Sequence, residues 1–588
     1  MIVKMKKVYL IVQNKDAFSS LEALRELGVI HVEHEKEPIS LDTQKLGKDI
    51  QLLTDSTAIL EEYQKEDFVR YDGDWEKAAK EIISLSQRKS HLNEQISKRS
   101  VKIDFWKAWG NFHPKDIISL REKGVYVYLA EISKKEIKNI PAGSKVEVLG
   151  QKGNMLRVLT VANKEITLPF TALTLPEVGL EELAAEQARD KEEVSRVTNK
   201  LTGLIAAKDL LEKELAQKKS QLKFQEALAG MGNETGLSYL KGFCPLPLIE
   251  GLKKQANTSK WGLLLEDPSA DDFVPTLLEN PKWIKLVNPI FEFMGIVPGY
   301  READVSLCFL FFFSAFFGIL IGDAGYGLIF FFSFFFLHQK MKGKVKDFTW
   351  IYLLYVLSSS AIIWGIFTGT FFGTVLFGKY VKPVIPWLSD ERKLQFLCFL
   401  IGAIHLTIAH AWKAIRKGKT WLVLSDAGWI VIVWSAFFYA QQFILSVPVP
   451  SWVNPAVIIS FFVIIAFSQT LEDIKKDAAS LVVNSLLTVL SVISTLIDVI
   501  SYIRLFAVGI AGVSLADSFS QMALGIGFKS FLFGILAIVI LAAGHMLTLV
   551  LGILAVMVHG LRLNILEFSG HLGLEWSGRP YEPLRKSI

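Results

Sequence analysis

The composition of this chain changes near residue 300, and that change constrains the fold more than any other feature. Up to about Tyr300 the sequence is charged and mixed, whereas from Asp304 to about Ser569 it is dominated by Phe, Ile, Leu, Val and Gly. The start, Met1-Ile-Val-Lys-Met-Lys-Lys, leads into an apolar run that is too short for a signal-peptide core, so we expect the N-terminal half to stay in the cytoplasm. The sequence predicts an integral membrane protein with a large soluble head.

Eight apolar segments in the second half predict eight membrane-spanning helices. They lie near residues 305–321, 324–338, 349–377, 394–415, 421–445, 453–467, 481–522 and 529–568. Gly322-Asp-Ala-Gly-Tyr-Gly327 interrupts the first apolar run, which we expect to form a tight helical hairpin. Three of the predicted cytoplasmic loops contain lysine clusters, at residues 338–346, 413–419 and 472–477. This bias favours cytoplasmic N- and C-termini, although the outward loop 379–393 also carries four basic residues.

The last two apolar segments are unusually long, and each contains an arginine. About forty helical residues would span ~60 Å, twice the hydrocarbon thickness, so these helices must be tilted or project from the membrane. Arg504 and Arg562 remain charged, and each costs about 2.5 to 3.5 kcal/mol at the bilayer centre on insertion scales. Each must therefore face a protein partner, a water-filled cavity or an anion. Counted from a turn near 525–528, the two arginines differ in depth by about thirteen residues, or ~20 Å.

The sequence of the soluble half predicts two long helical arms between small α/β lobes. Strand-like and helical patterns alternate within residues 7–33 and again within 124–161, and two charged stretches of helical period flank the second lobe. This order predicts an antiparallel coiled coil with a lobe at its tip. A continuous helix of some fifty residues would hold that tip ~75 Å from the base. The sequence predicts a cytoplasmic domain, residues 1–300, and a transmembrane domain, residues 301–588, with a short cytoplasmic tail. Within the cytoplasmic domain we expect a proximal lobe formed by 1–40 and 235–300, coiled-coil arms formed by 41–106 and 176–231, and a distal lobe formed by 107–175.

Several common chemistries are not supported by the sequence. Cys244, Cys308 and Cys398 lack the spacing of a disulfide framework or a zinc site. Gly418-Lys-Thr420 resembles the end of a phosphate loop, but the first glycine of that motif would fall at Lys413. No Arg-rich patch interleaved with base-stacking aromatic residues indicates nucleic-acid binding. We expect no metal, cofactor or nucleic-acid partner.

Five motifs spread along the membrane half and its borders carry a resemblance of the whole chain to a known family. They are Ser501-Tyr-Ile-Arg-Leu505, His559-Gly-Leu-Arg-Leu-Asn-Ile-Leu-Glu567, the glycine-rich break at 322–327, Tyr300-Arg-Glu-Ala-Asp304 and Gly578-Arg-Pro-Tyr-Glu-Pro583. With them the chain resembles the a subunit, or subunit I, of the rotary V-type and archaeal-type ATPases. The resemblance implies a mainly α fold with small α/β lobes, namely a coiled-coil dumbbell and an eight-helix transmembrane domain with two long tilted C-terminal helices.

The same resemblance implies a role as the membrane stator of a prokaryotic ATPase. A ring of proteolipid c subunits would turn against the last two helices, and two half-channels would load and unload the ring carboxylates with H⁺ or Na⁺. The implied partners also include peripheral-stalk subunits of E/G type at the cytoplasmic lobes, a central-stalk d/C-type subunit and membrane lipid. The residues expected to serve ion translocation are Arg504 and Arg562 as the family arginines, with Asp498, His559, Glu567 and Asp323 as candidate polar liners.

Structural roles remain open for these liners. Asp498 and Glu567 could form local ion pairs, Asp323 could cap a turn, and His559 could bond a neighbouring helix. Two positions differ from the family pattern: Leu551-Gly-Ile553 stands where the eukaryotic members carry a glutamate, and Gly512 replaces the family histidine. His405 and His410 are five residues apart, which favours a core or channel-lining role over a metal site.

Two other classes of protein remain as alternatives. A secondary transporter with a regulatory head would require paired broken helices in an internal repeat, and none is apparent. A coiled-coil membrane anchor or receptor would use the arginines structurally. The sequence indicates neither the coupling ion nor the direction of the reaction, synthesis or pumping.

Overall fold

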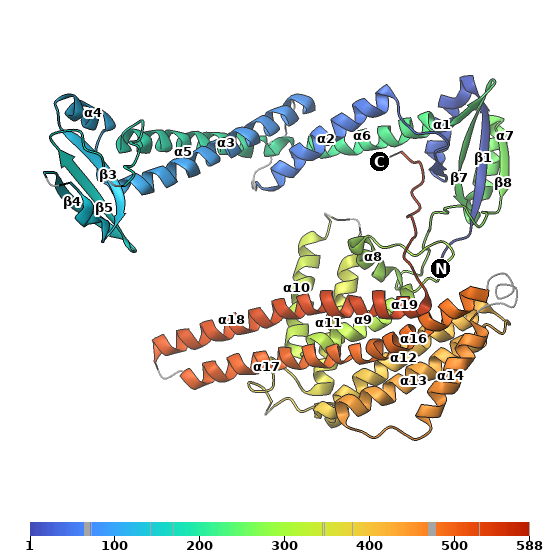
Figure 1. The fold of residues 1–588 in the computed structure, drawn as a ribbon. Coiled ribbons are helices and arrows are strands. Elements are labelled where there is room, and N and C mark those ends of the chain that lie inside the picture. Colours follow the sequence, from blue (N-terminus) through green and yellow to red (C-terminus); the bar gives the residue numbers. More distant parts are fainter. Residues whose placement is uncertain are drawn as a thin grey trace. The chain divides into compact units, whose positions relative to one another are not determined.

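The computed structural model describes residues 1–63, 71, 73–141, 143–168, 170–343, 345, 347–378, 380–468, 478–527 and 530–586 (Figure 1). The predicted cytoplasmic loop 472–477 lies outside these ranges. The chain forms two compact units. One comprises Val8–Gly242, Gly251–Leu264 and Pro583–Ile588, and the other comprises Met1–Lys7, Phe243–Glu250 and Leu265–Glu582.

The head contains long helices between two small sheets, as the helical and strand-like patterns predict. Its main elements in chain order are β1 (Met5–Gln13), α1 (Ala17–Leu27), β2 (His31–Glu33), α2 (Leu41–Glu61), α3 (Trp75–Lys107), α4 (Pro114–Glu122), β3 (Tyr126–Ser133), β4 (Lys145–Lys152), β5 (Met155–Ala162), α5 (Leu180–Gly203), α6 (Lys208–Ala229), β6 (Gly232–Glu234), β7 (Leu237–Pro245), α7 (Ile249–Ser259) and β8 (Gly262–Glu266).

The two sheets lie at opposite ends of the helical arms (Figure 1). The first has the strand order β2-β7-β1-β8, with β6 paired to β7. The second has the order β3-β5-β4, and its strands are antiparallel. Alternate residues of β5 are buried, including Leu156 and Val158, which share a small core with Ala130 and Ile132 of β3.

Each arm consists of two helices, whereas the sequence predicted continuous arms. Helix α2 packs along α6 and α3 packs along α5. Asp74 starts α3 by accepting a hydrogen bond from the Glu76 N–H at 3.2 Å, and the other arm passes through a short 3-10 turn at Leu204–Ala207. Buried apolar residues from both arms form one core at these interruptions, so packing is maintained across them. The first arm is therefore divided into two helices, whereas the second stays helical from Leu180 to Ala229 across its 3-10 turn.

The membrane half is helical throughout its apolar segments. Its main helices are α8 (Asn288–Met294), α9 (Ser306–Ile321), α10 (Ala324–Met341), α11 (Thr349–Thr368), α12 (Glu391–Lys417), α13 (Val423–Leu445), α14 (Val453–Phe467), α16 (Ala478–Ser501), α17 (Ile503–Ile526), α18 (Phe531–Ala555) and α19 (Ser569–Leu572). Five helical stretches are long and apolar enough to cross a membrane, or six if α9 and α10 count as one broken span, within the part of the chain that the structure describes. The count of eight spans and the cytoplasmic termini stay predictions.

The predicted break in the first apolar run is present. Helix α9 ends at Gly322, which has a left-handed backbone with φ of 65°, and α10 begins after Asp323. The axes of α9 and α10 are bent by 119°. Helix α11 ends at Thr368, earlier than the predicted 377, because Gly369 adopts φ of 74° and the chain turns into a loop.

The two long apolar stretches each cover 42 residues, Ser485–Ile526 and Phe531–Leu572. The first is interrupted at Tyr502, between α16 and α17. The second contains two π-helical segments, Val556–Gly560 and Leu563–Phe568, between α18 and α19. Helices α17 and α18 lie side by side (Figure 1), as expected for the last two helices.

Candidate functional site

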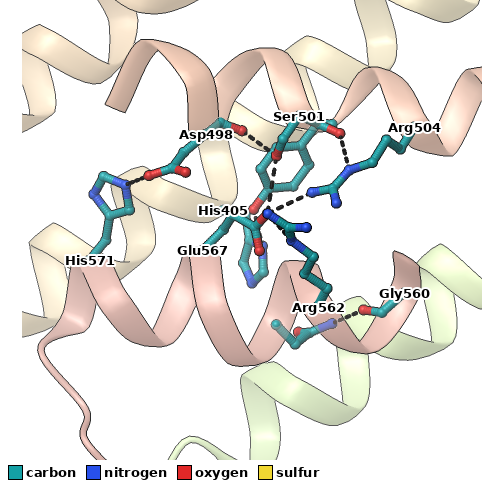
Figure 2. Close-up of polar contacts among 10 residues, drawn as sticks. His405, Asp498, Ser501, Arg504, Gly560, Arg562, Glu567 and His571 are labelled. Atoms are coloured by element: carbon teal, nitrogen blue, oxygen red, sulfur yellow. Dashed lines mark hydrogen bonds and ion pairs between the residues drawn. The ribbon is translucent and has the colours of Figure 1, made fainter. Parts of the chain in front are cut away.

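Arg504 and Arg562 converge on the same carboxylate oxygen. Arg504 Nη2 lies 2.6 Å from Glu567 Oε1, and Arg562 Nε lies 3.4 Å from that same atom (Figure 2). The Glu567 side chain is 3% exposed, whereas those of Arg504 and Arg562 are 21% and 55% exposed. The two guanidinium groups share one buried carboxylate, so this trio holds one positive charge in excess.

The π-helical geometry explains how Arg562 reaches Glu567. In an α-helix, residues five apart point about 140° away from each other, since each residue turns the helix by about 100°. A π-helix closes its hydrogen bonds from i to i+5, which places residues five apart close to one face. Arg562 stands between the two π segments, and Glu567 belongs to the second.

The predicted depth offset between the arginines is smaller in the structure. Arg504 lies 22 residues before the end of α17, and Arg562 lies 31 residues after the start of α18. The remaining difference of nine residues corresponds to ~13 Å of ideal helix, less than the ~20 Å expected. The two long arginine side chains, both directed at the Glu567 carboxylate, span this remaining offset. Both arginines therefore belong to one site.

Arg504 is also held by the backbone of the preceding helix. Its Nε donates to the Ser501 carbonyl at 2.8 Å, and Ser501 Oγ lies 3.4 Å from Glu567 Oε1. Arg504 Nη1 makes no hydrogen bond to the described residues, and Glu567 Oε2 is buried without a partner among them. The cluster is anchored on one side and has unused donor and acceptor capacity on the other.

A cavity of about 290 Å³ adjoins Glu567. Asp498, His410 and His571 also line it. His571 Nε2 lies 3.1 Å from Asp498 Oδ2, and His571 Nδ1 lies 2.9 Å from His410 Nε2. Asp498 therefore takes part in a hydrogen-bonded chain beside the arginine cluster. We did not predict His571, although it follows Glu567 by four residues, one helical turn, and this spacing could have indicated it.

His405 has a packing role at the break between α16 and α17. Its Nδ1 lies 2.8 Å from the Tyr502 hydroxyl, and its ring stacks on Phe312 and Phe568 at centroid distances of 3.9 and 4.4 Å. Both His405 and Tyr502 are fully buried. His405 therefore serves the core, whereas His410 lines the cavity, and the sequence left both roles open for each.

Asp323 lies in a separate polar group. Its carboxylate accepts four backbone hydrogen bonds, from Gly325, Tyr326, Phe372 and Gly373, at 2.7 to 3.1 Å. These contacts cap α10 and fix the loop after α11, so the geometry favours the turn-capping role.

Tyr326, His545 and Asp517 are further polar side chains of this region, and His559 lies in the π-helical segment Val556–Gly560. Tyr326 OH lies 2.7 Å from His545 Nδ1, and Asp517 accepts three hydrogen bonds from Thr374 and Val375, at 2.6 to 2.9 Å. Asp517 was missed because nothing in the sequence pairs α17 with that loop. His559 is half-buried, and its Nδ1 is buried without a hydrogen-bond partner among the described residues.

Comparison with known proteins places these features in one family. No family model matches the chain. The chain is 31% identical over the full length of both proteins to the V-type ATP synthase subunit I of Borreliella burgdorferi, and 28% identical over the full length of both to V-type ATP synthase subunit I 1 of Treponema pallidum. The crystal structure of the cytoplasmic N-terminal domain of subunit I, a homologue of V-ATPase subunit a, aligns with 44% of the chain at 16% identity, but its TM-score of 0.22 is too low to support the fold. The full-length relatives are sufficient, and the chain belongs to the subunit I family of the V/A-type ATP synthases, a membrane subunit of a rotary ATPase.

Proposed function

We propose that this chain is the non-catalytic membrane stator of its ATPase and that Arg504 and Arg562 form the fixed positive barrier between two ion half-channels. The observation that carries the proposal is the convergence of both arginines on Glu567 Oε1. A proteolipid ring carrying one carboxylate on each subunit would turn past this cluster. Coupling then follows from attraction between an empty ring carboxylate and the excess positive charge.

The charge balance of the cluster supports this role. Glu567 compensates only one of the two guanidinium groups, and Arg504 has a donor nitrogen that no described residue uses. An incoming carboxylate could bind that donor without displacing Glu567. A loaded, neutral carboxylate would be attracted far less, so the cluster favours release of the ion. Permanently charged arginines would also repel a cation moving directly from one half-channel to the other.

The cavity beside Glu567 is the candidate for the cytoplasmic half-channel. It is lined by acidic, basic and hydroxyl side chains within a helical domain that is otherwise strongly apolar. Its position next to α19 agrees with the predicted cytoplasmic C-terminus. We assign the other half-channel to the polar group around Tyr326, His545 and Asp517, where Asp323 stabilises the surrounding backbone.

We further propose that residues 1–300 form the cytoplasmic anchor for peripheral-stalk and central-stalk subunits. Two α/β lobes joined by paired helices offer separate attachment points at the two ends of the arms. Ion pairs tie the outer arm helices together, including Arg88 Nη2 to Glu193 Oε1 at 2.8 Å and Arg99 Nε to Glu186 Oε2 at 3.2 Å. Such cross-links suit a part that must resist torque.

The decisive experiment replaces Arg504 in the assembled ATPase. Arg504→Ala should reduce ATP-driven ion transport in reconstituted vesicles at least tenfold, while the complex still assembles. Arg504→Lys should transport more than Arg504→Ala but less than the unmodified complex, because lysine keeps a charge but lacks the guanidinium fork. The matched control is Arg392→Ala, which removes an exposed arginine at the start of α12 and should transport normally.

Two outcomes would contradict the stator proposal. Normal transport by an assembled Arg504→Ala complex would favour the alternative in which the arginines are structural. Solute transport by this chain reconstituted alone would favour a secondary transporter.

A further inference from the structure

An apolar cavity of about 360 Å³ lies between four membrane helices and the short helix α8. Helices α9, α10, α11 and α18 contribute to its wall, together with the π-helical segment Val556–Gly560. Every side chain in this wall is aliphatic or aromatic. Such a space offers water few hydrogen-bond partners, and an apolar cavity of ~150 Å³ already stays dry and binds benzene. The cavity is therefore suited to a hydrocarbon ligand.

The wall of the cavity is buried on one side and exposed on the other. Phe313 of α9 and Leu357 of α11 are 3% and 4% exposed. In contrast, Phe293 of α8 is 74% exposed, and Ile553 and Met557 are 47% and 39% exposed. The cavity thus opens at the surface of the helix bundle, where lipid surrounds a membrane protein.

The cavity extends along the helices over about one membrane leaflet. Phe317 lies eleven residues after the start of α9, and Leu357 lies eight residues after the start of α11. Phe330 lies eleven residues before the end of α10. At ~1.5 Å per residue these lining positions are ~12 to ~16 Å deep, about half of the ~30 Å hydrocarbon core. The acyl chains of one leaflet occupy this depth.

Exposed lysines lie at the same end of the bundle as the cavity. Lys282 and Lys285 precede α8, whereas Lys340 and Lys342 lie at the end of α10. The turn that begins at Lys285 packs against α9 and α11, and Pro289, four residues later, lines the cavity. None of these lysines forms an ion pair with the part of the chain that the structure describes. Their ammonium groups are therefore available to an anion.

Acidic groups at this end are fewer than the lysines. The predicted cytoplasmic loop 338–346 contains four lysines and no acidic residue. Glu279 and Glu292 are exposed, and Asp347 accepts two hydrogen bonds from Thr349, at 2.6 and 2.9 Å. A cationic rim beside an apolar cavity fits an anionic phospholipid, with its phosphate at the lysines and one acyl chain inside.

The cavity also touches the segment that positions Arg562. Val556 and Met557 belong to the first π segment, and Leu561 directly precedes Arg562. A hydrocarbon chain in the cavity would pack against these three side chains. It would add van der Waals contacts to a backbone geometry that is rare in helices. Loss of the chain would remove this support next to the arginine.

We propose that this cavity binds one acyl chain of an anionic phospholipid and that the bound lipid stabilises the π-helical geometry that directs Arg562 to Glu567. The lipid site stands on the cavity and the lysines alone, whereas its effect on coupling rests on the stator function proposed above. A zwitterionic phospholipid lacks the net charge that the lysines select. A helix of a partner subunit in the cavity would exclude lipid altogether.

The binding test uses the whole ATPase in phosphatidylethanolamine vesicles that contain a trace of phosphatidylglycerol with a photoreactive diazirine in one acyl chain. Illumination should label peptides containing Phe293 or Met557 about fivefold more strongly with this lipid than with the matching phosphatidylcholine, as expected for attraction to a single lysine near the surface. A peptide containing Phe462, which is exposed on α14, reports ordinary bilayer contact and should show no preference.

Two lysine variants test the rim of the cavity. Lys285→Gln combined with Lys342→Gln should remove the preference and leave the fold intact, since both side chains are exposed. Lys419→Gln removes an exposed lysine elsewhere on the same predicted side and should keep the preference. Equal labelling of the cavity peptides by the two lipids would show ordinary bilayer contact, and absence of label from them would show that a partner fills the cavity. Either result overturns the proposal.

The coupling test measures charge moved per ATP hydrolysed, with a voltage-sensitive dye that responds to either ion. Phosphatidylglycerol should raise this ratio several-fold over the same amount of phosphatidylcholine, and the double lysine variant should lose the increase. Selective labelling without any effect on the ratio would overturn the role of the lipid at Arg562. If Arg504→Ala transports normally, the stator proposal fails, whereas the labelling result is read without transport and stands or falls separately.

Discussion

Two buried carboxylates in the membrane half, Asp323 and Glu567, are neutralised in opposite ways. Asp323 is 0% exposed and accepts four backbone N–H groups from two segments, α10 and the loop after α11. Glu567 is 4% exposed and contacts two arginine side chains and a serine hydroxyl. Burial alone does not distinguish the two groups, but their partners do.

The partners of Asp323 are fixed by the fold, whereas the partners of Glu567 can be exchanged. Backbone amides cannot turn away without breaking the helix start and the loop, so Asp323 is tied to the fold. Arginine side chains can change partner by rotating their χ angles, and one oxygen of Glu567 has no hydrogen-bond partner among the described residues. We therefore expect substitutions at Asp323 to affect folding first and substitutions at Glu567 to affect coupling first.

The largest effect on stability is expected at Asp323. Asp323→Ala removes the acceptor of four buried N–H groups and should destabilise the membrane domain by about 4 kcal/mol or more, at roughly 1 kcal/mol for each lost bond. Asp323→Asn keeps one acceptor oxygen and should lose about half as much. The measurement is the fraction of chain that stays folded after heating in detergent. Folded Asp323→Asn complexes should still couple normally, and a coupling defect would remove the distinction drawn here.

A smaller stability loss and a larger functional loss are expected at Glu567. Glu567→Ala leaves two guanidinium groups without their shared anion and should cost about 3 kcal/mol. Glu567→Gln keeps the shape but removes the charge, so transport per assembled complex should fall several-fold, which ATP-driven transport normalised to complex content would measure. Normal transport by Glu567→Gln would place Glu567 with Asp323 among the structural carboxylates.

Asp272, which precedes the membrane helices, should show the smallest effect. Burial alone would raise the pKa of Asp272, but hydrogen bonds from Lys7 and Ser269 outweigh burial and lower that pKa to about 2. A lowered carboxyl pKa stabilises the fold above the unfolded value near 4, and that contribution disappears as the pH falls from about 4 to 2. We expect it to be about 2 kcal/mol, because each pKa unit corresponds to about 1.4 kcal/mol.

The measurement for Asp272 is the difference in unfolding temperature between the unmodified chain and Asp272→Asn at pH 6 and at pH 3. The difference should shrink at the lower pH. An equal difference at the two pH values would show that the charge of the Asp272 carboxylate does not stabilise the fold. Asp272 could then not serve as a reference for Asp323 and Glu567.

Much of the fold could be predicted because the patterns are local. The strands near 7–12 and 145–161 and the helix from 16 to 27 appear as β1, β4, β5 and α1, and the mainly α class with small α/β lobes is confirmed. Strands β7 and β8 were not predicted, because Gly and Pro punctuate that region and each strand is stabilised by partners distant in sequence. Breaks within the arms were also missed, since the apolar period continues through them.

The site could be predicted by residue type but not by arrangement. Charge in an apolar stretch indicated Arg504 and Arg562, and polar residues near them indicated Asp498 and Glu567. Their meeting at one oxygen depends on π-helical segments, which a reading at 3.6 residues per turn cannot reveal. His410 and Asp517 belong to networks that join different helices, so no local spacing shows their partners.

The π-helical stretch has a consequence for how this region can change during evolution. Each π turn holds one residue more than an α turn, so it behaves as an insertion that the helix has absorbed without breaking. Deleting one residue within either segment would return that segment to α geometry and leave the helix on both sides facing as before, whereas side chains inside the segment would change their direction. Relatives that differ here by a single gap would therefore keep the course of this helix but lose the local geometry that brings Arg562 to Glu567, although their aligned sequences would look almost unchanged.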